Sequence, residues 1–205
     1  MRFSSTAYDY DRAAGSYDRS HDRWLRYAGG EAQCAFEGAA TALLRPGMSM
    51  LDAACGTGTV VRRLLNGSRG KIDIALLDIS RQMLDQCHDI AARRVLGRME
   101  DLPFADNSFD LVTCAWGLEV LNDPEPALRE FVRVARADGR ICLVFCAERP
   151  AGSMLGTLFS AHIRHSRRGQ FLDTGTLAQT AAQAGASHVQ WLHCSGPAAA
   201  LILHV

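Results

Sequence analysis

The chain has 205 residues, of which 48% are apolar and 21% are charged, and its 22 basic side chains balance 22 acidic ones. This length and composition fit one globular domain with a full hydrophobic core. The balanced charge gives no pull toward nucleic acid, and no apolar run reaches the roughly 20 residues that a membrane-spanning helix needs.

Short apolar runs alternate with helix-like segments over most of the chain. Residues 8–27 are polar and aromatic and are expected to be irregular or partly helical, and an alanine-rich helix is expected at 31–44. Strands are expected at 49–54, 72–77, 95–99, 109–116 and 140–146. Helices are expected at 59–65, 80–93 and 124–137, the second capped by Ser80 and the third with Pro124 in its first position. This alternation predicts a parallel sheet with helices on both faces.

The pattern loosens after residue 146. We expect an apolar helix at 154–163, a basic stretch after it, and a helix that Asp173 or Thr174 caps and Gly185 ends. Residues 189–194 and 198–205 predict two strands joined by a short turn, and therefore an antiparallel hairpin. The predicted fold is a doubly wound, seven-stranded, mostly parallel, Rossmann-like α/β sheet in a single domain over residues 1–205.

The cysteines and the start of the chain bear on the compartment. Seven cysteines are scattered along the chain without C-x-x-C spacing, and the first ten residues lack the apolar core of a secretory signal. We therefore expect a cytoplasmic protein with reduced cysteines and no metal site. Nothing here decides between a monomer and a homodimer.

The strongest motif is a strand that runs directly into a turn with Gly56 and Gly58 and then into a helix. Glycines let the backbone turn sharply and let a ligand come close. The dinucleotide fingerprint G-x-G-x-x-G would need a third glycine where Val61 stands. Asp52, just before the turn, would attract a cationic ligand and repel a pyrophosphate. The motif therefore favours a cationic cofactor.

Asp78 ends the second predicted strand, at the same edge of the sheet as the glycine turn. A carboxylate there can accept two charge-assisted hydrogen bonds from a ribose diol. The alternative is a surface aspartate next to the helix that begins near Ser80.

Several motifs in this order resemble the class I S-adenosylmethionine-dependent methyltransferases of the ubiquinone/menaquinone-biosynthesis type. They are Leu51-Asp52-Ala53-Ala54-Cys55-Gly56-Thr57-Gly58, Leu77-Asp78-Ile79-Ser80, Glu100-Asp101-Leu102-Pro103-Phe104, Asp106-Asn107-Ser108-Phe109-Asp110 and the helix at 128–137. The resemblance covers roughly residues 8–146. It implies S-adenosyl-L-methionine as the cofactor and leaves the substrate open.

The resemblance implies a role for the glycine turn and for the second strand. Ala54 and Gly56, in the turn with Gly58, would meet the methionine part of the cofactor through the backbone. Asp52 would hold its amino group, and Asp78 would take the ribose.

The adenine is expected further along the same edge. The resemblance implies that Ile79 and Met83 would flank it, while Met99 and Glu100 would meet its edge. The family commonly has an aspartate where this chain has Arg98, and a guanidinium cannot accept a hydrogen bond from the adenine amino group.

Ala115 and Trp116, after the fourth strand, would lie beside the sulfonium and the substrate. Residues 1–30 are expected to form an N-terminal lid, with Tyr17 as a cofactor-side contact, and residues 147–172 a substrate-cover insertion. Ala54 also departs from the family, which usually has glycine there. An added methyl group should leave the turn intact if the backbone angles are unexceptional.

A sulfonium methyl group is already activated, so the enzyme mainly has to align a nucleophile and exclude water. If the acceptor needs a base, the candidates are Glu119, His162 and His165. Each could instead be a solvated surface side chain. The stretch that contains Arg164, Arg167 and Arg168 could bind a phosphate or carboxylate or touch an anionic membrane, or simply be a solvated helix face.

The leading hypothesis is methyl transfer to a small-molecule acceptor at oxygen, nitrogen or carbon, with a quinone-like, lipid-headgroup or secondary-metabolite substrate that could be anionic. The alternative, which Arg98 allows, is a module that binds S-adenosylmethionine or S-adenosylhomocysteine without catalysis. Val61 disfavours a nicotinamide oxidoreductase, and no three-thiol site for arsenic methylation is evident. A nucleic-acid substrate is disfavoured by the charge balance.

Overall fold

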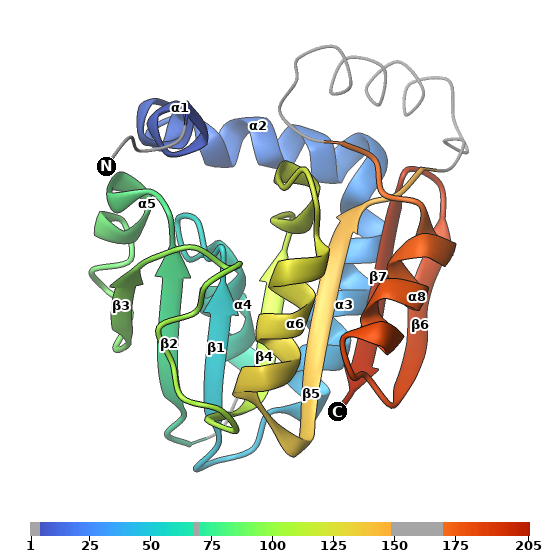
Figure 1. Cartoon of the computed structure of the whole chain (residues 1–205). Helices are drawn as coiled ribbons and strands as arrows, with labels where there is room; N and C mark the ends of the chain where they lie inside the picture. The colour runs from blue at the N-terminus through green and yellow to red at the C-terminus, as the bar shows by residue number, and fades with distance from the viewer. Residues whose placement is uncertain (1–4, 68–69, 149–169) are drawn as a thin grey trace.

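The computed structural model describes residues 5–67, 70–148 and 170–205, and within these it contains one seven-stranded sheet. The strand order is β3-β2-β1-β4-β5-β7-β6 (Figure 1). The strands are β1 Ser49–Ala53, β2 Asp73–Asp78, β3 Arg93–Leu96, β4 Phe109–Ala115, β5 Ala135–Cys146, β6 His188–Ser195 and β7 Ala198–His204. Strands β1 to β5 pair in parallel, and β7 runs antiparallel to both β5 and β6. The predicted fold, including the C-terminal hairpin, is confirmed.

Helices cover both faces of this sheet. They are α1 Ser5–Ala13, α2 Tyr17–Trp24, the π-helical turn η1 Leu25–Gly29, α3 Gly30–Leu43, α4 Thr59–Gly67, α5 Arg81–Asp85, the 3-10 turn η2 Leu118–Val120, α6 Glu125–Val134 and α8 Thr174–Gln183. In Figure 1, α6 and α8 lie in front of the sheet, and α3 and α4 lie behind it.

The strands bury both of their faces because successive side chains point to opposite sides of a sheet. In β4, Val112 packs in the cluster of α6 and α8, whereas the neighbouring Leu111 packs in the cluster of α3 and α4. Phe131 on α6 and Phe36 on α3 are fully buried in these two layers. Packing on both faces thus holds the strand in place between the two helix layers.

Three local expectations were wrong. The helix at Ser80 ends at Asp85 instead of residue 93, because the following residues form turns and Arg93 already pairs with β2. Helix α6 ends at Val134, because the chain enters β5 at Ala135 and pairs there with β4. Pro124 is the N-cap of α6, one residue before its first position.

The N-terminal segment is more regular than expected. Its two helices α1 and α2 lie across the carboxyl ends of the strands, above β1, β2 and β4 (Figure 1). Buried Trp24 at the end of α2 ties this layer to the core beneath it. None of the helices in the described ranges is long and apolar enough to span a membrane.

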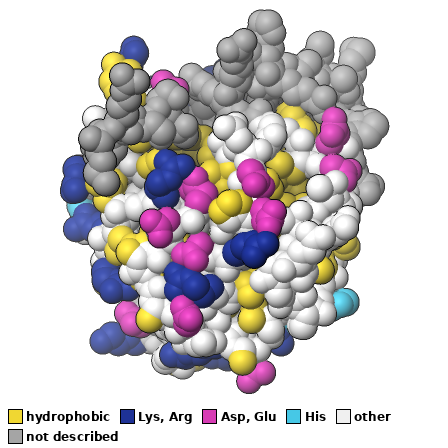
Figure 2. All heavy atoms as spheres, viewed as in Figure 1, with side chains coloured by type: hydrophobic (Ala, Val, Ile, Leu, Met, Phe, Trp, Pro, Cys, Tyr) yellow, Lys and Arg dark blue, Asp and Glu magenta, His cyan; other side chains and the backbone are white. Residues whose placement is uncertain are grey.

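Figure 2 shows basic and acidic side chains interspersed over the front face of the molecule, which carries α6. This mixing matches the equal numbers of the two charge types in the sequence. Since nucleic acid is held by patches of positive charge, this face does not resemble a nucleic-acid surface.

Candidate active site

A cavity of about 520 Å³ opens at the carboxyl edge of β1, β2 and β4, in the range typical of small-molecule sites. In an open α/β sheet this is the edge where ligands bind. Nine of the twelve residues predicted to contact the cofactor line it: Tyr17, Ala54, Gly56, Asp78, Ile79, Met83, Met99, Glu100 and Trp116. Residues from five separate segments of the sequence thus meet around one space.

The other three predicted contacts lie near this cavity but not on its wall. Asp52 and Ala115 line a smaller hollow of about 30 Å³, which shares Tyr17 and Gly56 with the large cavity. Gly58 lines neither space. A side chain on Gly58 would meet Ile90 at 2.6 Å, so this glycine serves the packing of the turn.

The backbone of the glycine turn is left-handed at three places. Gly56 and Gly58 have φ of +54° and +81°, and Ala54 has φ of +57°. The condition of unexceptional backbone angles at Ala54 is therefore not met. An alanine in this region costs roughly 1–2 kcal/mol. Gly117 makes room for it, because a side chain there would come within 2.8 Å of the Ala54 Cβ.

Asp78 connects the end of β2 to the glycine turn. One carboxylate oxygen accepts from the Gly56 backbone N–H and the other from the Ser80 N–H, both at 2.8 Å. The residue is only 7% exposed, so the alternative of a surface aspartate is wrong. Burial raises the pKa of Asp78 above its usual value, although the backbone hydrogen bonds oppose this shift. Each oxygen keeps a lone pair for a ligand hydroxyl.

Asp52 is a buried carboxyl with only half of its hydrogen-bonding capacity used. Its Oδ1 accepts from the Thr113 hydroxyl at 2.7 Å, while Oδ2 has no partner in the described part of the chain. Burial raises the pKa of Asp52 to about 7. An unpartnered buried carboxylate is costly, and a cationic group placed beside it would offset that cost. Asp52 therefore fits the amino group of S-adenosylmethionine.

Glu119 lies on η2, directly after β4, and is 6% exposed. The alternative of a solvated residue was therefore wrong. Its Oε1 accepts from the Cys146 thiol at 3.3 Å, and Oε2 has no partner among the described residues. Burial raises the pKa of Glu119 to about 7. Glu119 lines neither cavity, although its sequence neighbour Val120 lies on the wall of the larger one.

The other two candidate bases cannot be placed. His162 and His165 lie outside the described residues, as do Arg164, Arg167 and Arg168. The expectation of an anionic acceptor depends on these arginines and stays a prediction. No cluster of three or more histidine, cysteine, aspartate or glutamate side chains that could hold a metal occurs in the described ranges.

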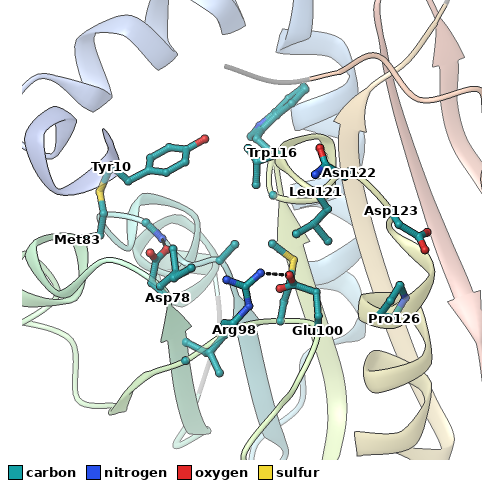
Figure 3. A pocket seen from close by; sticks show the side chains of 18 of the residues that line it. Tyr10, Asp78, Met83, Arg98, Glu100, Trp116, Leu121, Asn122, Asp123 and Pro126 are labelled. Atoms are coloured by element: carbon teal, nitrogen blue, oxygen red, sulfur yellow. Dashed lines mark hydrogen bonds and ion pairs between the residues drawn. The ribbon is translucent and has the colours of Figure 1, made fainter. Parts of the chain in front are cut away.

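The N-terminal helices are held against the cavity by two carboxylates. Asp11 accepts from the Ser80 hydroxyl at 2.5 Å, and Asp18 accepts from the Thr57 hydroxyl at 2.8 Å. The centroid of the Tyr17 ring lies 6.1 Å from that of the Tyr10 ring. Tyr10 points into the cavity (Figure 3).

Sequence reasoning missed Tyr10, although a signal was present. The pair Tyr-Asp occurs three times in this segment, at 8–9, 10–11 and 17–18. The far wall, formed by Leu121, Asn122 and Pro126, was also missed. No sequence motif marks these residues. They reach the cavity because the chain turns after β4.

Trp116 and Arg98 also line the cavity. Trp116 has φ of +56°, and its indole N–H donates to the Gln33 side chain at 2.6 Å, which fixes the ring against α3. Arg98 forms an ion pair with Glu100 on the cavity wall (Figure 3). This pair neutralises the guanidinium and occupies one acceptor oxygen of Glu100.

Part of the chain matches a known protein family. Residues 51–143 match the family described as "Methyltransferase domain". These residues are a methyltransferase domain. The predicted family is thereby confirmed for this part of the chain.

Relatives of the methyltransferase domain are C-methyltransferases by name. The ubiquinone/menaquinone biosynthesis C-methyltransferase UbiE of Hahella chejuensis is 36% identical over 127 residues, which cover 58% of this chain and 51% of that protein. The UbiE of Stenotrophomonas maltophilia (strain K279a) is 36% identical over 147 residues, covering 67% and 54% respectively. The chain thus spans about half the length of the curated relatives it matches.

Solved structures share the fold of this chain. A SAM-dependent methyltransferase from Thermotoga maritima, described as a possible histamine N-methyltransferase, aligns with a TM-score of 0.73 at 19% identity, over 97% of this chain and 99% of that one. The [4+2]-cyclase SpnF aligns with a TM-score of 0.61 at 22% identity, over 77% and 57%. The same fold therefore carries more than one chemistry.

Proposed function

We propose that this protein transfers a methyl group from S-adenosylmethionine to a carbon atom of a small, electron-rich ring such as a phenol or quinol. The observation that carries the proposal is the Asp52 carboxyl, buried beside the glycine turn with one oxygen unpartnered. A cationic cofactor is the ligand that such a group favours. The names of the relatives, which are C-methyltransferases, support carbon as the acceptor atom.

The residues of the β1, β2 and β3 edge would hold the cofactor, which supplies a methyl group on a positively charged sulfur when bound. Asp52 would accept from its amino group, and Asp78 would accept from the ribose hydroxyls. Met83 lies above Asp78 on the same side of the cavity in Figure 3 and would cover the adenine of the cofactor. The open space beside the Gly56 Cα leaves room for the cofactor to approach the backbone.

The acceptor would lie on the opposite side of the cavity, where Leu121 and Pro126 form an apolar wall (Figure 3). Glu119 would act there as the base. Its raised pKa of about 7 lets it take a proton from a phenol hydroxyl onto Oε2 near neutral pH. The electron density of the resulting phenolate increases at the ring carbons, which makes them nucleophilic.

The test is methyl transfer to a panel of phenols, quinols, primary amines and carboxylates, followed as S-adenosylhomocysteine release. Turnover with phenols or quinols and a methyl group on carbon are expected. Turnover restricted to amines or carboxylates would refute the acceptor class. Glu119→Gln should lower kcat and leave cofactor affinity unchanged.

A second candidate is a module that binds the cofactor without catalysis. The Arg98–Glu100 ion pair favours it, because it places a donor-only group where related chains commonly have an acceptor. Tight binding of S-adenosylmethionine with no turnover on any acceptor of the panel would support this candidate over the first.

A further inference from the structure

Two cysteines meet behind the glycine turn, and the proposed chemistry uses neither of them. Cys55 lies within the turn, and Cys87 follows α5. Both sulfurs lie within hydrogen-bonding distance of the Gly56 carbonyl oxygen, at 3.7 and 3.5 Å, and the Cys87 sulfur also lies 3.6 Å from the Met83 carbonyl oxygen. The single hydrogen of the Cys55 thiol can be donated either to the Gly56 carbonyl or to the Cys87 sulfur. The two side chains therefore form a dithiol that touches the cofactor turn itself.

The surroundings of the two sulfurs differ. Arg62 donates to the carbonyls of Thr57 and Gln86, on either side of the pair, and is held there by Asp89. The hydrogen bond from Cys55 and the positive charge of Arg62 lower the pKa of Cys87, whereas the same hydrogen bond and burial raise the pKa of Cys55. One sulfur is thus disposed to be a thiolate and the other to stay protonated, which suits disulfide formation.

We infer that Cys55 and Cys87 are a redox-sensitive pair, which hydrogen peroxide converts to a disulfide, and that this modification weakens cofactor binding. The effect on binding rests on the proposed function, whereas the disulfide itself does not. Cys55 lines the small hollow beside the cavity and Cys87 has no exposed surface, so an oxidant would have to enter through the cofactor site. A larger disulfide reagent does not suit a site in which Cys87 is fully buried.

The reaction balances with peroxide as the only oxidant. The Cys87 thiolate attacks one peroxide oxygen and the O–O bond breaks, which gives a sulfenic acid and a hydroxide that takes up a proton to become water. The Cys55 sulfur then attacks the sulfenic sulfur, the S–O bond breaks, and the thiol proton leaves with the hydroxyl group as a second water. Two thiols are oxidised by two electrons in total, and both peroxide oxygens are reduced.

The disulfide would act on the cofactor site through Gly56. In the reduced protein, both sulfurs lie within hydrogen-bonding distance of the Gly56 carbonyl oxygen, while the Gly56 N–H donates to Asp78. Oxidation removes both S–H donors and draws the two sulfurs to about 2 Å, well inside hydrogen-bonding distance. The turn is pulled toward the segment after α5, and the contact between Gly56 and the proposed ribose-binding Asp78 changes with it.

The test uses the full chain with Cys34→Ser and Cys194→Ser, which removes the two more accessible thiols. The protein is treated with hydrogen peroxide, with and without saturating S-adenosylhomocysteine. Peptide mass mapping identifies the linked cysteines, and calorimetry measures S-adenosylhomocysteine affinity before oxidation, after it, and after dithiothreitol. We expect a Cys55–Cys87 link that the ligand slows, an affinity at least about tenfold weaker, and recovery on reduction.

Cys87→Ala is the matched variant. It should bind S-adenosylhomocysteine as the parent does and lose no affinity after peroxide. The inference is overturned if mapping of the parent finds no Cys55–Cys87 link, if the linked protein binds the ligand as tightly as before, or if Cys87→Ala is equally sensitive. Failure of the reduced parent to bind S-adenosylhomocysteine would instead refute the proposed function, because the mapping needs no ligand.

Discussion

The replacement of Asp52 by asparagine should make the free protein more stable and its cofactor binding weaker. Asparagine has the same shape and keeps the bond that Thr113 donates to Oδ1. Above pH 7 the wild-type Asp52 carboxylate is negatively charged and buried, and one of its two oxygens has no partner among the described residues. The substitution removes this charge. A residue kept for folding alone would show the opposite result.

The size of the effect follows from the pKa. Asp52 titrates at 3.8 in a model peptide and at about 7 in the folded protein, so the folded state binds this proton more tightly. Wild-type stability therefore falls as pH rises from about 4 to about 7 and is constant above that. At about 1.4 kcal/mol per pKa unit, Asp52→Asn gains about 4 kcal/mol at pH 8 and almost nothing at pH 4.

Thermal unfolding at pH 5 and pH 8 measures this difference, which should raise Tm by roughly 10 °C at pH 8. Asp110→Asn is the control with the opposite sign. Asp110 accepts from the Ser49 backbone and from Arg136, and its pKa is lowered, so its loss should destabilise at pH 8. An Asp52→Asn variant whose Tm gain is absent, or equal at both pH values, would refute the reasoning.

Three further predictions follow from the site. Asp78→Ala should weaken S-adenosylhomocysteine binding roughly a hundredfold in calorimetry, because two charge-assisted hydrogen bonds of about 1.5 kcal/mol each are lost. An unchanged affinity would show that Asp78 does not bind the ligand. Wild-type kcat should rise with pH through about 7 as Glu119 loses its proton, and a stopped assay on Glu119→Gln should show no such rise. Gly117→Ala should destabilise by roughly 1–3 kcal/mol in thermal unfolding, since its Cβ would lie 2.8 Å from that of Ala54, and adding Ala54→Gly should recover part of the loss.

The fold was predictable because its signals are local. The inner strands β1, β2 and β4 are mainly apolar runs, and the glycine turn stands between a strand and a helix. Element ends were less accessible, as α5 shows: Ser80 caps the helix as expected, but the pairing of Arg93 with β2 decides where it must stop. Such long-range pairing leaves no periodic trace in the sequence.

Some residues of the site could be predicted from the sequence and others could not. The carboxylates Asp52 and Asp78 could be found because they stand at strand ends beside a motif. The strain at Ala54 could not, because a left-handed alanine is made tolerable by Gly117, which is far away in sequence. The burial of Glu119 likewise depends on Cys146 at the end of β5.

The most direct test of the central claim is calorimetric titration of the purified protein with S-adenosylmethionine, S-adenosylhomocysteine and NADH side by side. Tight binding of the first two and none of NADH is expected, with Asp52→Asn weakening both. A folded protein that binds neither S-adenosyl compound, or that binds NADH instead, would contradict it.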